Sequence, residues 1–496
     1  MNQPIYPSLY QINTRVWLTD LSTDLGRHAT LDDIPESELD RLASLGFDWI
    51  WLLSVWCTGE KGRTISVKNP MFRPGFVETL QDLQDDDIGG SGFAIADYTV
   101  NPDLGGDGAL ARFREKLQKR GLRLMLDFVP NHMGPDHHWV EEHPDYFISG
   151  SESDLINFPM NFTRVSTSGG DLILAFGRDP FFAGWPDTFQ LDYSNEAVAE
   201  AMQNELLRIS LQCDGVRCDM AMLLLPDVFE RTWGRRSQPF WPEVIKTIHE
   251  NTPGFCFLAE VYWDMEWIMH QQGFDYAYDK RLYDRLYEGH ARSVREHFFA
   301  GPSYQDKLTR FLENHDESRA AQTFDRKRHE AAAVLTYFSP GMRFFHQGQL
   351  EGRKKRISPH LVRAPFEQVD SSINNFYKNL LITLTRPEFR EGKWRLLECF
   401  PAWHGNESWD SFIAFGWLGA LGEKSLVIVN YAAYASQCYI CLCLPDLEDM
   451  QVRFTDLMGS SEYLRDGNQL MDRGIYLDLP PWGYHVFQID ILINEA

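Results

Sequence analysis

Short apolar runs alternate with stretches of helical periodicity over the first two thirds of the 496-residue chain. Eight runs have the length and composition of buried strands, and they lie at 8–12, 49–55, 123–129, 215–219, 256–261, 274–278, 309–314 and 342–346. The clearest helical stretches lie between them, at 37–45, 108–120, 196–211, 242–251 and 329–338. This α/β alternation predicts a parallel sheet, and eight units predict closure into a (β/α)8 TIM barrel. A doubly wound open sheet is the alternative, disfavoured because no glycine-rich phosphate loop follows the first strand.

Two long connections interrupt this rhythm, and both follow a predicted strand. The first covers 56–90, and the second covers 131–193 and is rich in Pro, Gly, His and aromatic residues. Connections after barrel strands lie over the carboxyl-terminal face, so both are expected above a functional site. The second is too long to be structureless. We therefore predict an excursion domain at 131–193, with the barrel formed by 1–130 and 194–390.

The pattern changes after a predicted helix at 371–385. Short strand-like segments separated by turn residues follow, at 411–417, 425–430, 438–444, 452–455 and 484–489. This spacing predicts that residues 391–496 form an all-β carboxyl-terminal domain, a β-sandwich.

Four of the predicted barrel strands lead directly into polar residues that suit a sugar-cleaving site. A single acid at a strand end is more often a cap or an ion-pair partner. A barrel, however, brings the ends of its strands together, so the joint occurrence on four strands favours one pocket. The residues expected to meet there are Asp219, Glu260, Asp316, Arg217, His132 and His315.

The residue types fit the two carboxyl groups that glycosidic cleavage requires, one ionised and one protonated. Arg217 precedes Asp219 by two positions, so both side chains lie on the same side of the strand, where the guanidinium favours an ionised nucleophile. Glu260 follows an apolar run, and such surroundings keep an acid protonated. A metal site made by Asp127 with Asn131 and the following histidine is the competing interpretation.

The four segments resemble the signature regions of the α-amylase superfamily, retaining glycoside hydrolases with a (β/α)8 barrel, an excursion domain after strand three and a carboxyl-terminal β-sandwich. This resemblance implies that Asp219 is the nucleophile, Glu260 the general acid/base and Asp316 the transition-state stabiliser. It also implies substrate-binding roles for Arg217, His132 and His315.

The resemblance extends to two further substrate-binding positions and to a metal. Gly92-Phe93 and Asp97 stand where the family has Gly-Tyr and an aspartate, which would make Phe93 the aromatic platform under the cleaved sugar. Asn131 matches a common calcium ligand, and Asp192 is a candidate for a second one. The chain has Met222-Leu223 where many members carry Lys-His, which weakens the case for calcium. The chemistry itself requires no metal or organic cofactor.

The amino-acid composition narrows the range of binding partners and cellular compartments. The net charge of −24 and the pI near 5.0 disfavour nucleic acid. No apolar run is long enough for a membrane helix, and no basic-then-apolar signal opens the chain. The 8 Cys lack metal-type spacing with His, which is typical of free thiols in a reducing compartment. A cytoplasmic location is expected.

Together these features predict a retaining enzyme that hydrolyses α-1,4-glucosidic bonds in malto-oligosaccharides or starch-like glucan. A transglycosylase of the same superfamily would use the same residues and pass the sugar to another sugar or a polyol. A non-catalytic carbohydrate-binding scaffold is the remaining alternative, and it is disfavoured because all three carboxylates are present. A metal-dependent barrel hydrolase would need more than two converging histidines.

Overall fold

A computed structural model describes residues 4–442, 444 and 447–492 of the chain. Eight parallel strands form a closed barrel, in which β1 pairs with both β2 and β14. In chain order they are β1 (Ser8–Asn13), β2 (Trp49–Leu53), β5 (Arg123–Phe128), β10 (Gly215–Cys218), β11 (Cys256–Ala259), β12 (Tyr276–Tyr278), β13 (Leu308–Phe311) and β14 (Met342–His346). Each strand overlaps one of the predicted runs, so the TIM-barrel prediction is confirmed.

The apolar runs form this barrel because both faces of each strand are buried. In β2, Trp49 and Trp51 belong to the cluster that fills the barrel interior, whereas Ile50 and Leu52 pack outward against the surrounding helices. The predicted helices are present as α2 (Glu36–Ser44), α5 (Gly106–Gln118), α8 (Glu196–Ser210), α10 (Trp241–Asn251) and α16 (Arg326–Tyr337).

Three long connections cover the carboxyl-terminal end of the barrel. The first contains β3 (Trp56–Thr58), α3 (Glu60–Lys68) and α4 (Arg73–Thr79). The second carries β6 (His132–Met133), α6 (Trp139–Glu142), α7 (Glu152–Asn157), the hairpin of β7 (Phe162–Thr167) with β8 (Gly170–Ala175), and β9 (Phe189–Gln190). The third, 347–370, joins β14 to α17 (Ser371–Leu384), contains no helix or strand, and was not predicted from the sequence.

The carboxyl-terminal region is formed mainly by β-sheets, as predicted, and also contains the short helix α19 (Gly467–Arg473). One antiparallel sheet contains β15 (Lys393–Leu396), β17 (Phe412–Leu418), β18 (Lys424–Asn430), β23 (Tyr484–Leu492), β20 (Gln451–Asp456) and β21 (Glu462–Asp466), in that order. A second sheet contains β16 (Cys399–Pro401), β19 (Ser436–Ile440) and β22 (Ile475–Leu479). Side chains from both sheets share one buried cluster, which is the packing of a sandwich. The strand predicted at 438–444 ends at Ile440, and residue 443 lies outside the described residues.

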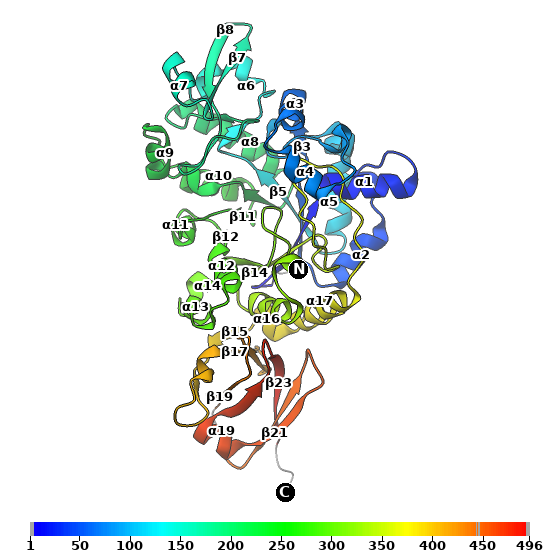
Figure 1. The fold of residues 1–496 in the computed structure, drawn as a ribbon, viewed down its shortest axis with the longest axis vertical. Helices are drawn as coiled ribbons and strands as arrows, with labels where there is room; N and C mark the ends of the chain where they lie inside the picture. The colour runs from blue at the N-terminus through cyan, green and yellow to red at the C-terminus, as the bar shows by residue number, and fades with distance from the viewer. Residues whose placement is uncertain (1–3, 443, 445–446, 493–496) are drawn as a thin grey trace.

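The sandwich packs directly on the barrel helices. Trp417 of β17 is buried and donates from Nε1 to the carbonyl of Phe338 (2.8 Å), and Tyr431 donates to the carbonyl of Leu286 in α12 (Lys280–Glu288) (2.7 Å). The hairpin β7–β8 lies at the opposite end of the molecule from the sandwich, with the barrel between them (Figure 1). The domain boundaries at 130, 193 and 390 stay predictions. Across the described residues, no helix has both the length and the apolar character needed to cross a membrane.

Candidate active site

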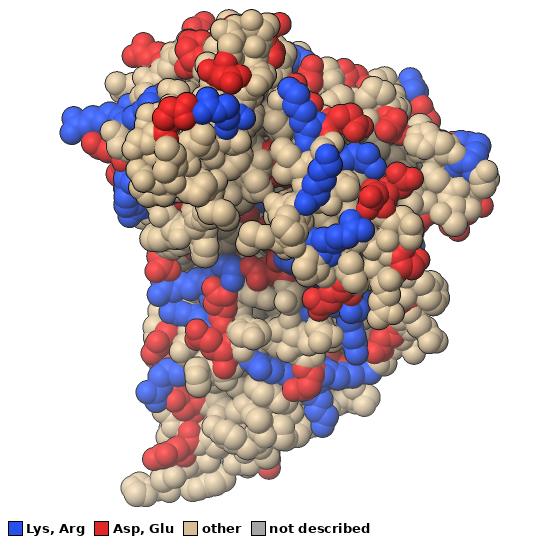
Figure 2. Space-filling view, turned by 45° about the horizontal axis from the view of Figure 1, so that its top comes forward, with Lys and Arg blue, Asp and Glu red and all other residues tan. Residues whose placement is uncertain are grey.

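A cavity of about 1140 Å³ lies where the barrel strands end, and the three predicted carboxylates all line it. Asp219, Glu260 and Asp316 follow β10, β11 and β13, so the parallel barrel brings together residues far apart in the chain. The three long connections supply the remaining walls, with residues such as Ile65, Phe72, Phe176, Trp185, Arg356 and His360. Figure 2 shows this face, with acidic side chains inside a central hollow and basic ones along its rim.

Arg217 lies beneath the carboxylates and contacts two of them at once. Its Nη1 is 2.6 Å from Asp219 Oδ1, and its Nη2 is 2.7 Å from Glu260 Oε2. The same Nη1 is 3.6 Å from Asp127 Oδ1. Burial alone would lower the pKa of Arg217, but Glu260 and its neighbours raise that pKa well above its ordinary value. The guanidinium is therefore a permanent cation at the floor of the cavity, as the two-residue spacing predicts.

Glu260 is held in the environment expected of an acid. Its side chain is 3% exposed, and burial, with smaller contributions from Asp219 and Asp316, raises its pKa to about 8. Its carboxyl group accepts hydrogen bonds from the backbone N–H of Met220 (2.7 Å) and the hydroxyl of Tyr262 (2.8 Å). Met220 has a φ of 44°, a left-handed conformation that is costly for a non-glycine residue. The residue that donates its N–H to Glu260 thus has a strained backbone conformation.

Asp316 is the most accessible of the three carboxylates, with a side-chain exposure of 44% against 8% for Asp219. Its Oδ2 is 3.1 Å from His315 Nε2. His315 Nδ1 accepts from the amide nitrogen of Gln11 (2.9 Å), so the proton of the neutral ring lies on Nε2, facing Asp316. Burial lowers the pKa of His315 well below its ordinary value, which keeps the ring neutral.

Two of the other predicted substrate contacts also lie at the cavity. His132 and Phe93 line it directly, and the His132 ring packs against Trp185, with centroids 5.2 Å apart. Burial lowers the pKa of His132, so its ring is neutral and both donates and accepts. Gly92 packs so closely on Ser54 that a Cβ there would overlap the serine side chain. Glycine at this position lets the chain bring Phe93 to the cavity wall.

Asp97 was also predicted to contact substrate, but the structure places it outside the cavity. It lies on β4 (Ile95–Val100), which pairs antiparallel with β3 outside the barrel. Its side chain is 46% exposed and 3.9 Å from Arg208 on α8, and it is not among the residues that line the cavity. The resemblance identified the position along the chain, but the local strand directs the side chain toward a helix.

The residues suggested for calcium do not fit a cation. The Asp192 carboxylate pairs with the Arg235 guanidinium and accepts from the Ser194 hydroxyl (2.6 Å). Asn131 Oδ1 accepts from the amide nitrogen of Gln190 (2.9 Å). An arginine thus already supplies the positive charge that a calcium ion would bring. No cluster of three or more His, Cys, Asp or Glu within the described residues has the arrangement of a metal site.

Several residues of the site were not predicted. Tyr262 lies two positions after Glu260, so the same spacing rule that paired Arg217 with Asp219 would have found it. Arg356 lines the cavity and donates from Nη1 to the carbonyl of Asp316 (2.7 Å). It belongs to the third connection, where no periodic pattern indicates the direction of a side chain.

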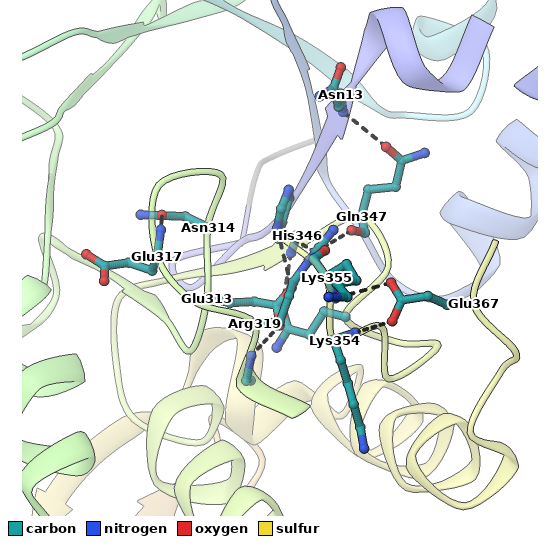
Figure 3. A network of polar contacts seen from close by, with 12 residues as sticks. Asn13, Glu313, Asn314, Glu317, Arg319, His346, Gln347, Lys354, Lys355 and Glu367 are labelled. Carbon is teal, nitrogen blue, oxygen red and sulfur yellow. Dashed lines mark hydrogen bonds and ion pairs between the residues drawn. The ribbon is translucent and has the colours of Figure 1, made fainter. Parts of the chain in front are cut away.

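A buried network fixes this third connection in place. Arg319 Nη1 donates to Glu313 Oε1 (2.6 Å) and to the carbonyl of Gln347 (2.8 Å), while its Nε donates to the carbonyl of Lys355 (3.0 Å). The Glu367 carboxylate accepts from the backbone N–H of Lys355 (3.2 Å), as Figure 3 shows. The segment that carries Arg356 and His360 is therefore anchored at both ends beneath the cavity.

Known proteins with similar sequences include transferases and synthases. The chain is similar to the α-1,4-glucan:maltose-1-phosphate maltosyltransferase of Salinibacter ruber, 34% identical over 142 residues, which are 27% of this chain and 19% of that protein. It is also similar to the trehalose synthase/amylase TreS of Mycolicibacterium smegmatis, 28% identical over 202 residues, which are 36% of this chain and 32% of the relative. The chain thus matches about a fifth to a third of the length of these relatives.

Solved structures match over nearly the whole chain. The maltogenic α-amylase AmyB of Thermotoga neapolitana has a TM-score of 0.69 at 18% identity, covering 98% of this chain and 99% of that one. The acarbose complex of an α-amylase from Geobacillus thermoleovorans has a TM-score of 0.68 at 18% identity, covering 99% of both chains. These likenesses establish the shared fold. The family model for the α-amylase catalytic domain matches residues 27–379, well over half of the sequence, so the chain belongs to the α-amylase family.

Proposed function

We propose that this chain is a retaining α-glycosidase that hydrolyses α-1,4-glucosidic bonds in malto-oligosaccharides or starch-like glucan. The observation that carries the proposal is the pair of carboxyl groups held by one guanidinium, with Asp219 and Glu260 on the two terminal nitrogens of Arg217. Retaining glycosidases use two nearby carboxyl groups with unequal proton affinity. The raised pKa of Glu260 supports its assignment as the acid.

The reaction would proceed by double displacement. Asp219 attacks the anomeric carbon while Glu260 gives its proton to the departing glycosidic oxygen, which leaves a β-glycosyl ester on Asp219. Glu260, now ionised, removes a proton from water, and the resulting attack on the anomeric carbon releases the sugar and regenerates both groups. Arg217 compensates the negative charge that passes between the two carboxyl groups. Asp316 and the neutral ring of His132 would bind ring hydroxyls.

The shape and chemistry of the cavity support a sugar oligomer as substrate. A volume of about 1140 Å³ exceeds what one sugar ring requires. Phe93 and Trp185 offer aromatic surface, and carboxylates and histidines offer hydrogen bonds to hydroxyl groups. The structurally similar G. thermoleovorans amylase was solved with acarbose bound, which supports an oligosaccharide ligand here.

Transglycosylation is the second candidate, and the relatives named maltosyltransferase and trehalose synthase favour it. Incubation with maltoheptaose, with products separated over time, distinguishes the two reactions. Hydrolysis predicts only shorter oligomers, whereas early appearance of longer oligomers would assign a transferase. A protein that binds maltoheptaose without converting it would instead support a scaffold.

Asp219→Asn is expected to lower kcat on maltoheptaose by at least about a thousandfold, because an amide cannot form the covalent intermediate. Steady-state rates and the melting temperature check this together. Asp214→Asn is the matched control, since Asp214 lies at the other end of β10 and pairs with Arg114 (2.7 Å). Its rate should stay near that of the wild type, and an unaltered rate in Asp219→Asn would remove Asp219 from the nucleophile role.

Glu260→Gln is expected to slow natural oligosaccharides by roughly a hundredfold to ten-thousandfold and activated aryl α-glucosides far less, because acid assistance matters most for poor leaving groups. Rates on both substrate types test the difference. Glu266→Gln is the control, since Glu266 is also buried but does not line the cavity. Equal losses on both substrates would argue against an acid role for Glu260.

The pH profile tests the same assignment without a mutation. Because the pKa of Glu260 is raised to about 8, the acid stays protonated at neutral pH and loses its proton only above that value. The value of kcat/KM should therefore hold to about pH 8 and then fall about tenfold per pH unit. Measurements with maltoheptaose from pH 5 to 10 check this. A fall that begins near the ordinary pKa of glutamic acid would contradict the assigned environment.

A further inference from the structure

One wall of the cavity contains a carboxylate that the proposed mechanism does not use. Asp187 lies in the second long connection and lines the cavity, yet the residue is only 3% exposed. Apart from its own backbone N–H, it has no hydrogen-bond donor among the described residues, and its Oδ2 has no hydrogen-bond partner there at all. Buried carboxylates are normally paired or hydrogen-bonded, so an unpaired one facing a cavity requires an explanation.

The three long connections meet around His360, next to this carboxylate. The nearest basic group is His360 Nδ1, from the third connection, at 3.9 Å from Asp187 Oδ2. That nitrogen is 2.9 Å from the hydroxyl of Ser66, on α3 of the first connection. The Ser66 hydroxyl also donates to the carbonyl of Gly62 (3.1 Å), so in this arrangement the imidazole donates to Ser66 and not to Asp187.

The histidine does not neutralise the carboxylate. Burial lowers the pKa of His360 to about 4, so the ring is uncharged at neutral pH. The ring also packs against Phe72 and Phe76, with centroids 5.0 and 5.7 Å away. The Asp187 carboxylate therefore lies beside aromatic surface without a cation of its own, and its Oδ2 is a buried acceptor without a partner among the described residues. The hydroxyl groups of a neutral sugar could donate hydrogen bonds to this carboxylate.

We propose that Asp187 forms a separate sugar-binding subsite, in which its carboxylate accepts hydrogen bonds from hydroxyl groups of a neutral glycosyl unit. This inference rests on the proposed function and deepens it. The subsite is distinct from the three carboxylates on the barrel strands because the connections between elements build it. His360 and Ser66 position the wall opposite Asp187, so all three connections contribute to the choice of sugar.

A role in binding and a role in folding predict opposite effects on stability. The carboxylate of Asp187 accepts no hydrogen bond from another described residue, so Asp187→Asn should leave the melting temperature unchanged or higher. Asp179→Ala is the control from the same connection, because an asparagine there would keep the acceptor oxygen. The Asp179 carboxylate accepts from the backbone N–H of Phe181 (2.6 Å) and Phe182 (2.9 Å), so its loss should lower the melting temperature and leave sugar affinity unchanged.

The binding experiment uses the Asp219→Asn protein, in which turnover does not interfere with calorimetric titration of maltotriose. Adding Asp187→Ala should weaken maltotriose binding by roughly tenfold to a hundredfold, the effect of losing hydrogen bonds to a charged acceptor. Monodeoxy maltotrioses identify the donor. The monodeoxy maltotriose that lacks the hydroxyl bound by Asp187 should bind the Asp219→Asn protein more weakly than maltotriose does. In the protein that carries both Asp219→Asn and Asp187→Ala, the two sugars should bind equally well.

Three results would each overturn the proposed subsite at Asp187. Equal affinity of the single and double variants for maltotriose would overturn this inference while leaving the proposed function intact. An Asp187→Asn protein that does not fold, or that melts well below the wild type, would show a structural role and overturn it too. If the Asp219→Asn protein does not bind maltotriose at all, the proposed substrate class and this subsite are both wrong.

Discussion

The charge balance of the candidate active site depends on the buried guanidinium of Arg217, which contacts Asp219 and Glu260. Four carboxyl groups, from Asp127, Asp219, Glu260 and Asp316, lie close enough to affect one another, and one cation cannot balance four anions. Burial raises the pKa of Asp127 to about 7 and that of Glu260 to about 8, so the most enclosed groups are those that retain protons. Removing Arg217 would leave Asp219 buried without its counter-charge. In the proposed mechanism, the balance of charge between Asp219 and Glu260 thus depends on one residue that does not line the cavity.

The barrel and its connections make separate contributions. The strands place the reacting groups and Arg217 in a rigid ring, because their side chains are fixed by packing on both faces of the sheet. The connections build the walls that face the rest of the substrate. The third of them has no regular structure, yet Arg319 and Glu367 hold its backbone by hydrogen bonds. A loop anchored in this way can present Arg356 and His360 at fixed positions without forming a helix or strand.

Features that repeat along the chain were predictable from the sequence. The eight apolar runs, and the sheet-rich end of the chain, follow from periodicity, because burial on both sides of a strand selects apolar residues throughout. The pairing of Arg217 with Asp219 follows from the two-residue period of a strand, as confirmed by their contact at 2.6 Å. Four strands of the carboxyl-terminal region, β15, β16, β21 and β22, were not predicted. Each has only three to five residues, too few for a period of two to stand out.

Other features depend on contacts that no local pattern encodes. Asp97 was placed by its position in a resembling motif, but the direction of its side chain depends on the antiparallel pairing of β4 with β3. Asp192 was considered as a metal ligand from the family resemblance, whereas its partner Arg235 lies 43 positions away in the sequence and could not be foreseen. The isolation of Asp187 depends on the mutual arrangement of three connections. Each of these depends on tertiary contacts, which is why the sequence alone does not reveal them.

The aromatic side chains that fill the barrel interior also determine the route by which substrate and water reach the candidate active site. Trp49, Trp51, Tyr278 and Phe344 are buried within it, so no passage runs through the strands to the far side. Molecules therefore reach the three carboxylates from the carboxyl-terminal end of the barrel. In the proposed reaction, the detached sugar leaves and water enters at this same end. A fragment that stays bound there can take the sugar back from the glycosyl ester, whereas a fragment that leaves quickly allows water to hydrolyse the ester. In that mechanism, the ratio of hydrolysis to transfer depends on how fast the detached sugar leaves this end of the barrel.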